Sequence, residues 1–445
     1  MESKYSLPYD GGLIMDGTPT DIIHRYEKIP TSVFSTESQG AEYVAEEIVN
    51  AINAHEANRP FALGLTTGRT PLGVYQALVK RYQAREVSFK NVEVFSLDEF
   101  YPIKAKEQQS RNYRIHEDFI SQVDIPQENV HIIDGTIPTS KVTKYCADYD
   151  RKARNIDLMV IGMGEQGQIG FNEPGSYAKS VTRLVQLTYQ SRKQQASLFH
   201  GAENTPKMAI TMGLNTVMSA KRIILMAWGE DKAQILHKTV EEDATRLIPA
   251  SMLQNHPAIE AVVDDAAADL LTVKKAPWVV GPCDWTPRLV RKAVVWLCEV
   301  VKKPILKLTY QDYISNSLGE MLDIIGMEYS DVNIKVFNDL QHTITGWPGG
   351  KPNADDSTRP VPSSPYPKRV IIFSPHPDDD VISMGGTFIR LAEQGHDVHV
   401  AYQTSGNVAV HDDVVLQHID SARELGYGDR VEEVKKIIAS KKKGE

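Results

Sequence analysis

Short apolar runs alternate with longer amphipathic stretches along residues 40–275 of this 445-residue chain. The runs are almost continuously apolar, which is typical of strands that are buried on both faces of a sheet. The stretches between them carry apolar residues at helical spacing. The pattern predicts strands at residues 61–66, 92–97, 157–161, 222–227 and 260–263, and helices at 71–82, 139–151 and 231–240. This alternation indicates a doubly wound, mostly parallel α/β sheet of the Rossmann-like type.

The pattern changes beyond residue 275. Helical periodicity follows, most clearly at 288–301, and then a proline-rich segment with Asn, Asp and Ser, which is typical of an extended linker. New strands are expected at 369–374 and 397–401. We therefore predict a first α/β domain, a helical extension, a linker and the N-terminal part of a second Rossmann-like α/β domain, at residues 1–275, 276–346, 347–368 and 369–445.

Composition narrows the class of protein. A hydrophobic content of 41% and a charged content of 24% are those of an ordinary soluble globular protein. The sequence has neither an eighteen-residue apolar window nor an apolar signal core at its start, so we expect a cytoplasmic protein with no membrane partner. The three cysteines lack CxxC spacing, which argues for reduced thiols. A net charge of −9 disfavours nucleic-acid binding, so a phosphorylated substrate needs a local cationic pocket.

The most informative segment is a glycine-rich loop after the strand expected at 157–161. Its glycines let the backbone approach a ligand closely, and Glu173 precedes a proline that stiffens the exit. In an open α/β sheet, ligands bind beyond the carboxyl ends of the strands. We therefore expect the site around this loop, whose glycines are Gly162, Gly164, Gly167 and Gly170.

Two other strand ends carry polar residues. The turn of Thr66, Thr67, Gly68, Arg69 and Thr70 leads to Pro71, expected at the first position of a helix, and such a turn favours phosphate. An ordinary strand-to-helix turn is the alternative. The pair Asp98-Glu99 follows the next strand, where a carboxylate can remove a proton next to a carbonyl. A helix N-cap is the alternative for this pair.

Together the three segments resemble the glucosamine-6-phosphate deaminase family over about residues 30–275. Further matches lie at 87–90, 123–126, 206–211 and 229–232. The resemblance implies conversion of glucosamine 6-phosphate to fructose 6-phosphate and ammonia without a metal or other cofactor. It also implies a small-molecule amino-sugar phosphate as the partner and a homo-oligomeric assembly.

The resemblance assigns roles by position. Asp98 matches the general base that moves the carbon-2 proton, and Glu173 matches the acid that supports the ring-opening residue. Lys232 matches the phosphate-binding lysine, and the turn from Thr66 to Thr70 matches the phosphate cradle.

The glycine-rich loop departs from the family pattern. The family has an Asp and a His in an acid/base relay, and this chain has Gln166 and Gln168 there. A glutamine amide cannot shuttle a proton, and the loss of a positioned acid/base costs about 10² to 10⁴ in rate. Uncatalysed ring opening, water or Glu165 are expected to compensate in part.

Two further departures affect ligand binding. Ser197 replaces an arginine of the family, and we hypothesise that Arg69 supplies the missing guanidinium from the other side. In the family's allosteric pocket Ser176 and Arg183 match, whereas Val185 replaces a lysine. Activation by N-acetylglucosamine 6-phosphate is therefore not expected.

A second motif, Ser374-Pro-His-Pro-Asp-Asp-Asp380, follows the strand expected at 369–374. A histidine and carboxylates in a strand-end turn suit a zinc site, and a polar loop is the alternative. The motif resembles the zinc-dependent N-acetylglucosaminyl deacetylases of the LmbE-like or PIG-L family. By position, His376 and Asp379 match zinc ligands, Asp378 matches the general base, and Asp380 replaces a glutamate.

The zinc site implied by this resemblance is incomplete. The third ligand of the family is a histidine well downstream, and none of the remaining histidines sits in a matching motif. We therefore expect at most weak zinc binding and no deacetylase activity from this chain. The histidines are His396, His399, His411 and His418.

Four functions follow from these observations. The leading prediction is an amino-sugar-phosphate deaminase/isomerase with Asp98 as base. A sugar-phosphate-binding or regulatory homologue without turnover is the first alternative, and Gln166 and Gln168 favour it. Lactone hydrolysis on the same fold and a zinc-dependent deacetylase are the others.

Overall fold

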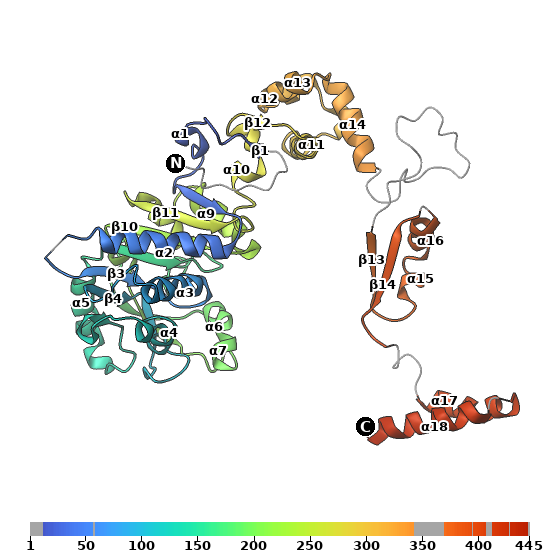
Figure 1. Cartoon of the computed structure of the whole chain (residues 1–445), viewed down its shortest axis with the longest axis horizontal. Helices are drawn as coiled ribbons and strands as arrows, with labels where there is room; N and C mark the ends of the chain where they lie inside the picture. Colours follow the sequence, from blue (N-terminus) through green and yellow to red (C-terminus); the bar gives the residue numbers. More distant parts are fainter. Residues whose placement is uncertain are drawn as a thin grey trace. The chain divides into compact units, whose positions relative to one another are not determined.

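The computed structural model describes residues 12–56, 58–341, 369–393, 395–405, 412–426 and 428–443. The chain divides into two compact units (Figure 1). One comprises Met1–Lys302 and Thr309–Met327, and the other comprises Lys303–Leu308 and Glu328–Glu445. The linker predicted at 347–368 lies outside the described residues. The boundaries of the four predicted regions stay predictions.

A parallel sheet forms the middle layer of the first unit. Among the described residues it contains seven strands in the order β2-β11-β10-β7-β3-β4-β6, and all neighbours are parallel. The strands are β2 (Thr31–Phe34), β3 (Phe61–Leu65), β4 (Val92–Ser96), β6 (Val130–His131), β7 (Leu158–Gly162), β10 (Arg222–Ala227) and β11 (Ile259–Asp264). The five strands predicted from the sequence are β3, β4, β7, β10 and β11, so the mostly parallel α/β fold is confirmed.

The order of the strands reverses at the centre of this sheet. From β3 the chain adds β4 and β6 on one side, and then it adds β7, β10 and β11 on the other. The reversal therefore lies between β3 and β7, and ligands of doubly wound sheets bind beyond the carboxyl ends of strands at such a point. The polar turn after β3 and the glycine-rich loop after β7 flank this point.

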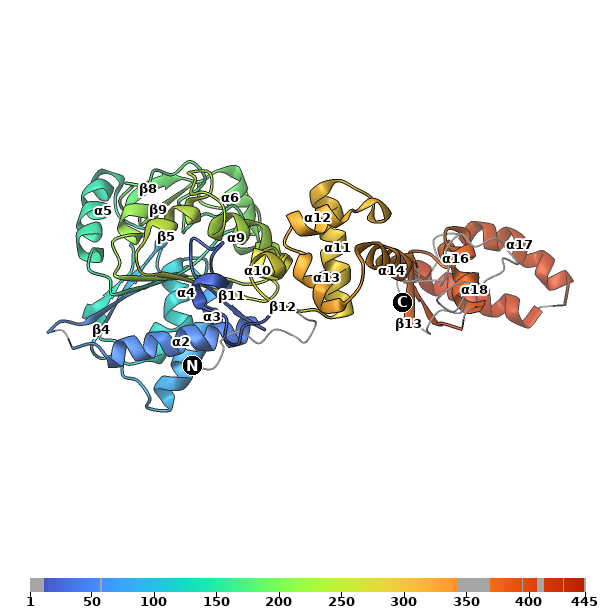
Figure 2. The same cartoon turned by 90° about the horizontal axis from the view of Figure 1, so that it is seen from above.

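The side chains of β10 show how the sheet is covered on both faces. Ile223 and Leu225 belong to one core cluster, with α5 and α9, whereas Ile224 and Met226 belong to another, with α2 and α3. Figure 2 shows these pairs of helices on opposite sides of the sheet. Because all four side chains are buried, the strand is continuously apolar rather than alternating. The helices are α2 (Glu37–Asn53), α3 (Arg69–Gln83), α5 (Thr139–Ala153) and α9 (Ala233–Val240).

Two helix starts differ from the prediction. Helix α3 begins at Arg69, so Pro71 is not its first residue but lies within its first turn, where a helix tolerates a missing N–H. The helix predicted at 231–240 begins as the 3₁₀ turn η3 (Glu230–Lys232) and continues as α9.

A small antiparallel sheet leaves the central one directly after β4. Its order is β5-β9-β8, with β5 (Asp98–Tyr101), β8 (Arg183–Gln186) and β9 (Met208–Thr211). Leu97 lies at the junction, because its N–H donates to Leu65 and its carbonyl accepts from Met212. The helices α4 (Arg111–Asp118) and α6 (Tyr189–Gln194) follow β5 and β8 in the chain. The sequence pattern did not predict this sheet, and it supplies Asp98 to the site.

The region predicted as a helical extension contains helices of both units. The first unit contains α11 (Pro287–Val301), α12 (Tyr310–Ser315) and α13 (Gly319–Ile325). In the second unit, Asn333 of α14 (Tyr329–Gln341) donates to the Leu308 carbonyl at 2.9 Å. Within the described residues, no helix combines the length and the apolar character that a membrane span requires.

The second unit also contains a short parallel pair, β13 (Arg369–Ser374) and β14 (Asp397–Tyr402). Both strands were predicted. The helices α15 (Asp379–Ile382) and α16 (Gly385–Glu393) connect them, and α17 (Asp412–Glu424) and α18 (Gly428–Lys443) follow. Among the described residues this sheet has two strands, and Ile371 and Phe373 on one face are exposed.

Candidate active site

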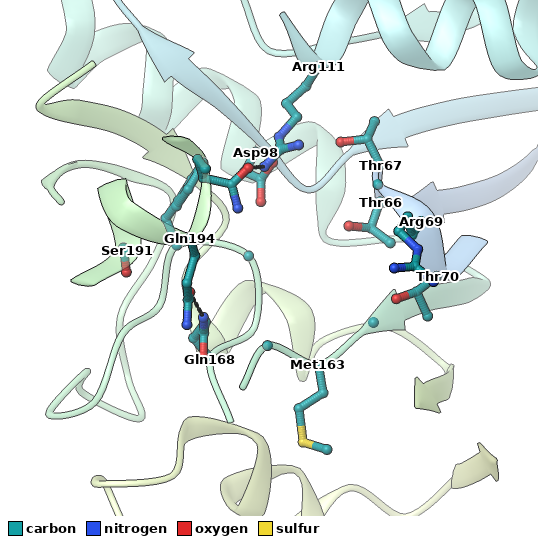
Figure 3. Close-up of a pocket in the computed structure, with 16 residues that line it drawn as sticks. Thr66, Thr67, Arg69, Thr70, Asp98, Arg111, Met163, Gln168, Ser191 and Gln194 are labelled. Atoms are coloured by element: carbon teal, nitrogen blue, oxygen red, sulfur yellow. Dashed lines mark hydrogen bonds and ion pairs between the residues drawn. The ribbon is translucent and has the colours of Figure 1, made fainter. Parts of the chain in front are cut away.

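A cavity of about 200 Å³ lies at the carboxyl ends of β3 and β7, and Figure 3 shows its walls. Segments that are distant in the sequence line it together. Most of the lining side chains are polar, so the cavity suits a hydrophilic ligand. The lining residues are Thr66, Thr67, Gly68, Arg69, Thr70, Asp98, Arg111, Gly162, Met163, Gly164, Gln168, Gly170, Phe171, Ser191, Gln194 and Gln195.

The turn after β3 forms one wall and leads into α3. Two side chains fix the backbone of this turn: Tyr75 donates a hydrogen bond to the Thr66 carbonyl, and Trp228 donates one to the Thr70 carbonyl. The Thr67 hydroxyl is buried, and among the described residues it has no hydrogen-bond partner. Among the described residues, no side chain caps the start of α3. A rigid turn with unused donors at a helix N-terminus is a ready anion site.

Arg69 is the first residue of α3 and lines the same cavity. Its side chain is exposed and lies beside Thr66 and Thr70 in Figure 3. Within the described part of the chain, Arg69 forms no ion pair. The hypothesis that this guanidinium binds a ligand phosphate stays a prediction.

The neighbouring acids Asp98 and Glu99 have different surroundings. Glu99 accepts hydrogen bonds from the Ser110 hydroxyl at 2.6 Å and from the N–H groups of Arg111 at 2.9 Å and Asn112 at 2.8 Å. Glu99 thereby holds the start of α4 from strand β5, whereas the N-cap residue of that helix is Ser110. Asp98 faces the cavity, because successive residues of a strand point to opposite faces.

Arg111 is the residue that approaches Asp98. Its Nε lies 3.4 Å from Asp98 Oδ1, and its guanidinium lies over the rings of Phe100 and Phe171 at 4.8 and 5.7 Å. Burial raises the pKa of the Asp98 carboxyl, and the charge of Arg111 lowers it only in part. Sequence reasoning missed Arg111, because no motif connects it to Asp98.

Gly170 forms the floor beneath Asp98. Its φ is +56°, and a Cβ at this position would lie 2.8 Å from Asp98 Oδ2 and 3.0 Å from the Thr211 hydroxyl. Asn172 secures the same loop by donating to the carbonyls of Ile169 and Met212 at 2.9 and 2.7 Å. A glycine is thus required here both by the backbone conformation and by the close approach of the carboxylate.

A chain of side-chain amides forms the wall opposite the Thr66–Thr70 turn. Gln168 accepts from the N–H of Gln166 at 2.9 Å and donates to Gln194 at 2.9 Å, and Gln194 donates to Glu165 at 3.0 Å. A Cβ at Gly164 would lie 2.1 Å from the Gln168 amide, so this glycine makes room for it. The chain ends on a carboxylate, but amides do not conduct protons as an imidazole does.

Three predicted site residues are not among the described residues that line the cavity. They are Gln166, Glu173 and Lys232. Glu173 accepts hydrogen bonds from the backbone and hydroxyl of Thr188, at 3.1 and 3.3 Å. Lys232 pairs with Asp231 at 3.0 Å. Gln194 and Gln195, which the sequence did not indicate, line the cavity instead.

The C-terminal motif at residues 374–380 is more exposed to solvent than the cavity around Asp98. His376 Nδ1 lies 3.0 Å from Asp379 Oδ2, and Asp378 is the N-cap residue of α15. Asp380 is buried and hydrogen-bonds with Ser374, so it has a structural role. Within the described residues no group of three or more His, Cys, Asp or Glu side chains could hold a metal. The described side chains of this motif therefore do not by themselves form a complete zinc site.

Comparison with known proteins defines the class. The model of the glucosamine-6-phosphate isomerase/6-phosphogluconolactonase family matches residues 35–262, which is more than half of the chain. The chain therefore belongs to this family. A second family model, that of GlcNAc-PI de-N-acetylase, matches residues 371–441, so both resemblances stated from the motifs are confirmed.

Individual relatives agree with this assignment. A protein of Bacteroides thetaiotaomicron, provisionally named a glucosamine-6-phosphate deaminase-like protein, is 45% identical over 438 residues, and the match covers 95% of this chain and 66% of that protein. The chain thus spans just under two thirds of this relative. A solved structure of a monomeric glucosamine-6-phosphate deaminase is 30% identical, with a TM-score of 0.52, and it matches 54% of this chain and all of its own.

Proposed function

We propose that the first unit is an amino-sugar-phosphate deaminase/isomerase that converts glucosamine 6-phosphate and water to fructose 6-phosphate and ammonia. The observation that carries the proposal is the Asp98 carboxylate, which is 6% exposed and lines the same small cavity as the Thr66–Thr70 turn. A positioned carboxylate can remove a proton from a carbon next to a carbonyl. The family and the named relatives support this chemistry.

In the proposed reaction, the phosphate binds at the Thr66–Thr70 turn with Arg69, and the other end of the sugar extends toward Asp98. Asp98 takes the carbon-2 proton of the open-chain aldehyde. The C–H electrons then form a double bond between carbons 1 and 2, and the carbonyl electrons move to oxygen, which takes a proton from water. Asp98 returns its proton to carbon 1 as the amine forms a C=N bond. Water hydrolyses this iminium and releases ammonia.

Every step of this reaction is a proton transfer or a hydrolysis, so the proposal requires no metal or organic cofactor. Opening of the sugar ring is the step that the site is expected to accelerate least. Gln168 can donate or accept a hydrogen bond at the ring oxygen, but it cannot transfer a proton. We therefore propose that water opens the ring, with a rate reduced by about 10² to 10⁴ relative to a site with a positioned acid/base.

The first test is release of ammonia and fructose 6-phosphate from glucosamine 6-phosphate by the purified chain, beside Asp98→Asn. Turnover that the variant reduces by about 10² to 10⁴ is the expected result. Turnover that persists unchanged in the variant would contradict the role of Asp98. Arg69→Ala is expected to weaken binding of the sugar phosphate, and unchanged affinity would contradict its role.

A second candidate function is sugar-phosphate binding without turnover. The chain of amides from Gln168 to Glu165 favours it, because it replaces a titratable relay by fixed hydrogen bonds. Glucosamine 6-phosphate that raises the melting temperature without being consumed would support this candidate. Assembly into a homo-oligomer, a cytoplasmic location and zinc at His376 and Asp379 remain predictions.

A further inference from the structure

Arg111 has donor groups that its contacts in the protein do not use. A guanidinium carries five N–H donors. Its Nη2 donates to Gln195 at a long 3.4 Å, and its buried Nε faces Asp98 Oδ1 at 3.4 Å as an ion pair but has no hydrogen-bond partner among the described residues. The side chain is 11% exposed and lines the cavity. A buried cation with unused donors beside a cavity indicates an anionic or carbonyl oxygen of a ligand.

The position of this guanidinium is rigidly supported. Glu99 binds the backbone N–H of Arg111 at the start of α4, and the rings of Phe100 and Phe171 lie against the guanidinium. Donors that are fixed before the reaction stabilise a developing charge without a cost of reorganisation. Arg111 is therefore preorganised rather than free to follow a ligand.

The distance to Asp98 relates Arg111 to the reacting atoms. Carbon 2 of a substrate must come within about 3 to 3.5 Å of the Asp98 carboxylate for proton transfer. The oxygen on carbon 1 is two bonds away from carbon 2. Since Arg111 Nε lies 3.4 Å from Asp98 Oδ1, that oxygen comes within reach of the guanidinium.

The positions of the two cationic side chains in the cavity agree with this placement of the substrate. Arg69 lies at the phosphate turn, whereas Arg111 lies beside Asp98. Gln168 adds an amide but no charge. The lining thus places one cation near the expected phosphate and another near the reacting end of an extended ligand.

We propose that Arg111 is a catalytic residue that binds the oxygen on carbon 1 of an open-chain amino-sugar phosphate. When Asp98 takes the carbon-2 proton, the carboxylate loses its charge, and the new negative charge develops on the carbonyl oxygen. Arg111 then exchanges an ion pair with Asp98 for one with the enolate oxygen. This inference rests on the proposed function. Because a carboxylate at carbon 1 also offers a negatively charged oxygen to Arg111, the inference extends the ligand class to phosphorylated sugar acids.

Calorimetric titration with two acyclic probes tests the inference without turnover. Both are phosphorylated at carbon 6 and carry an amine at carbon 2. One is 2-amino-2-deoxygluconate 6-phosphate, with a carboxylate at carbon 1, and the other is 2-amino-2-deoxyglucitol 6-phosphate, with a hydroxyl. We expect the wild type to bind the carboxylate probe roughly tenfold more tightly or better, as a charge-assisted hydrogen bond implies.

Variants at two arginines of one helix provide the comparison. Arg111→Gln should lose the preference for the carboxylate and bind the hydroxyl probe as the wild type does. Arg114→Gln is the matched control, because Arg114 is exposed on the same helix and does not line the cavity within the described residues, and it should keep the preference. Arg111→Lys, which keeps the charge, should recover part of the preference even if the glutamine variant folds poorly.

The outcomes distinguish failure of this inference from failure of the proposed function. Equal binding of both probes by the wild type, or a preference that survives in Arg111→Gln, would overturn the role of Arg111 and leave the sugar-phosphate site intact. Binding of neither probe by the folded wild type would overturn the sugar-phosphate site and this inference with it.

Discussion

Two strand ends of this chain carry acidic motifs, and their surroundings differ. Asp98 is 6% exposed and faces Arg111 in a cavity lined by distant segments. The His376 side chain is 62% exposed, and its nearest charged partner, Asp379, is three residues away and 33% exposed. The local sequence can place an acid at the end of a strand, but burial of that acid depends on other parts of the chain.

The two sheets explain this difference. The central sheet is covered by helices on both faces, and the small β5-β9-β8 sheet adds residues around its carboxyl edge. The pair β13 and β14 leaves Ile371 and Phe373 exposed among the described residues. A perturbed pKa and a specific charge partner require burial, and burial requires contributions from distant parts of the chain.

The largest effect is expected from replacing Asp98 and Glu99 one at a time, because the two acids have different roles. Asp98→Asn should reduce turnover by about 10² to 10⁴, because it removes the general base. Glu99→Gln should instead lower the free energy of unfolding by about 2 kcal/mol, since it weakens charge-assisted hydrogen bonds at the start of α4. Ammonia release and urea titration measure the two effects. Equal rate losses in both variants would contradict the division of roles.

Gly170→Ala should test how closely the floor of the cavity fits Asp98. Its Cβ would displace the Asp98 carboxylate, and a misplacement of about 1 Å can cost on the order of 10² in rate. Gly326→Ala is the matched control, because its φ of +62° is similar and nothing lies within 4 Å of its Cβ. Both variants should lose stability, but only Gly170→Ala should lose turnover. A normal rate for Gly170→Ala would contradict the fit.

Asp157, beside the start of β7, contrasts with the proposed general base Asp98. Burial raises its pKa, but hydrogen bonds from Arg59 and Lys221 lower it more, to about 2. Its contribution to stability is therefore present above the unfolded value near 4 and is lost as the pH falls toward 2. Asp157→Asn should destabilise the protein by about 2 kcal/mol at pH 7, without a direct effect on turnover. Equal stability losses at pH 7 and pH 2 would contradict this.

The pH dependence of Asp98 should have the opposite sign. Because burial raises its pKa, the folded protein holds this proton more tightly, so the stability from Asp98 is greatest below about pH 4 and falls as the pH rises through the raised pKa. Turnover needs the carboxylate and should rise over the same range. Arg111→Gln should move the acid limb of the pH–rate profile to higher pH. An acid limb that stays in place would contradict the coupling.

The smallest effect is expected at the C-terminal motif. His376→Ala and treatment with a chelator should leave ammonia release unchanged, since the proposed reaction uses no metal. Measured beside Asp98→Asn, this comparison separates the two acidic motifs by function. Loss of ammonia release on chelation would contradict the proposed reaction.

The sequence by itself determined the α/β class, five of the seven described strands of the central sheet and two of the loops around the site. These signals are local: a strand buried on both faces must be continuously apolar, and a turn close to a ligand requires glycine or unused donors. The strand predicted at 222–227 coincides with β10 for this reason.

Only the tertiary structure decided which polar groups meet. The division of roles between Asp98 and Glu99, the approach of Arg111, and the amide chain through Gln194 all join residues that no motif connects. Their positions depend on β5 leaving the central sheet and on α4 and α6 lining the cavity. Burial and opposing charge arise from packing between distant segments, and the order of residues along the chain does not encode them locally.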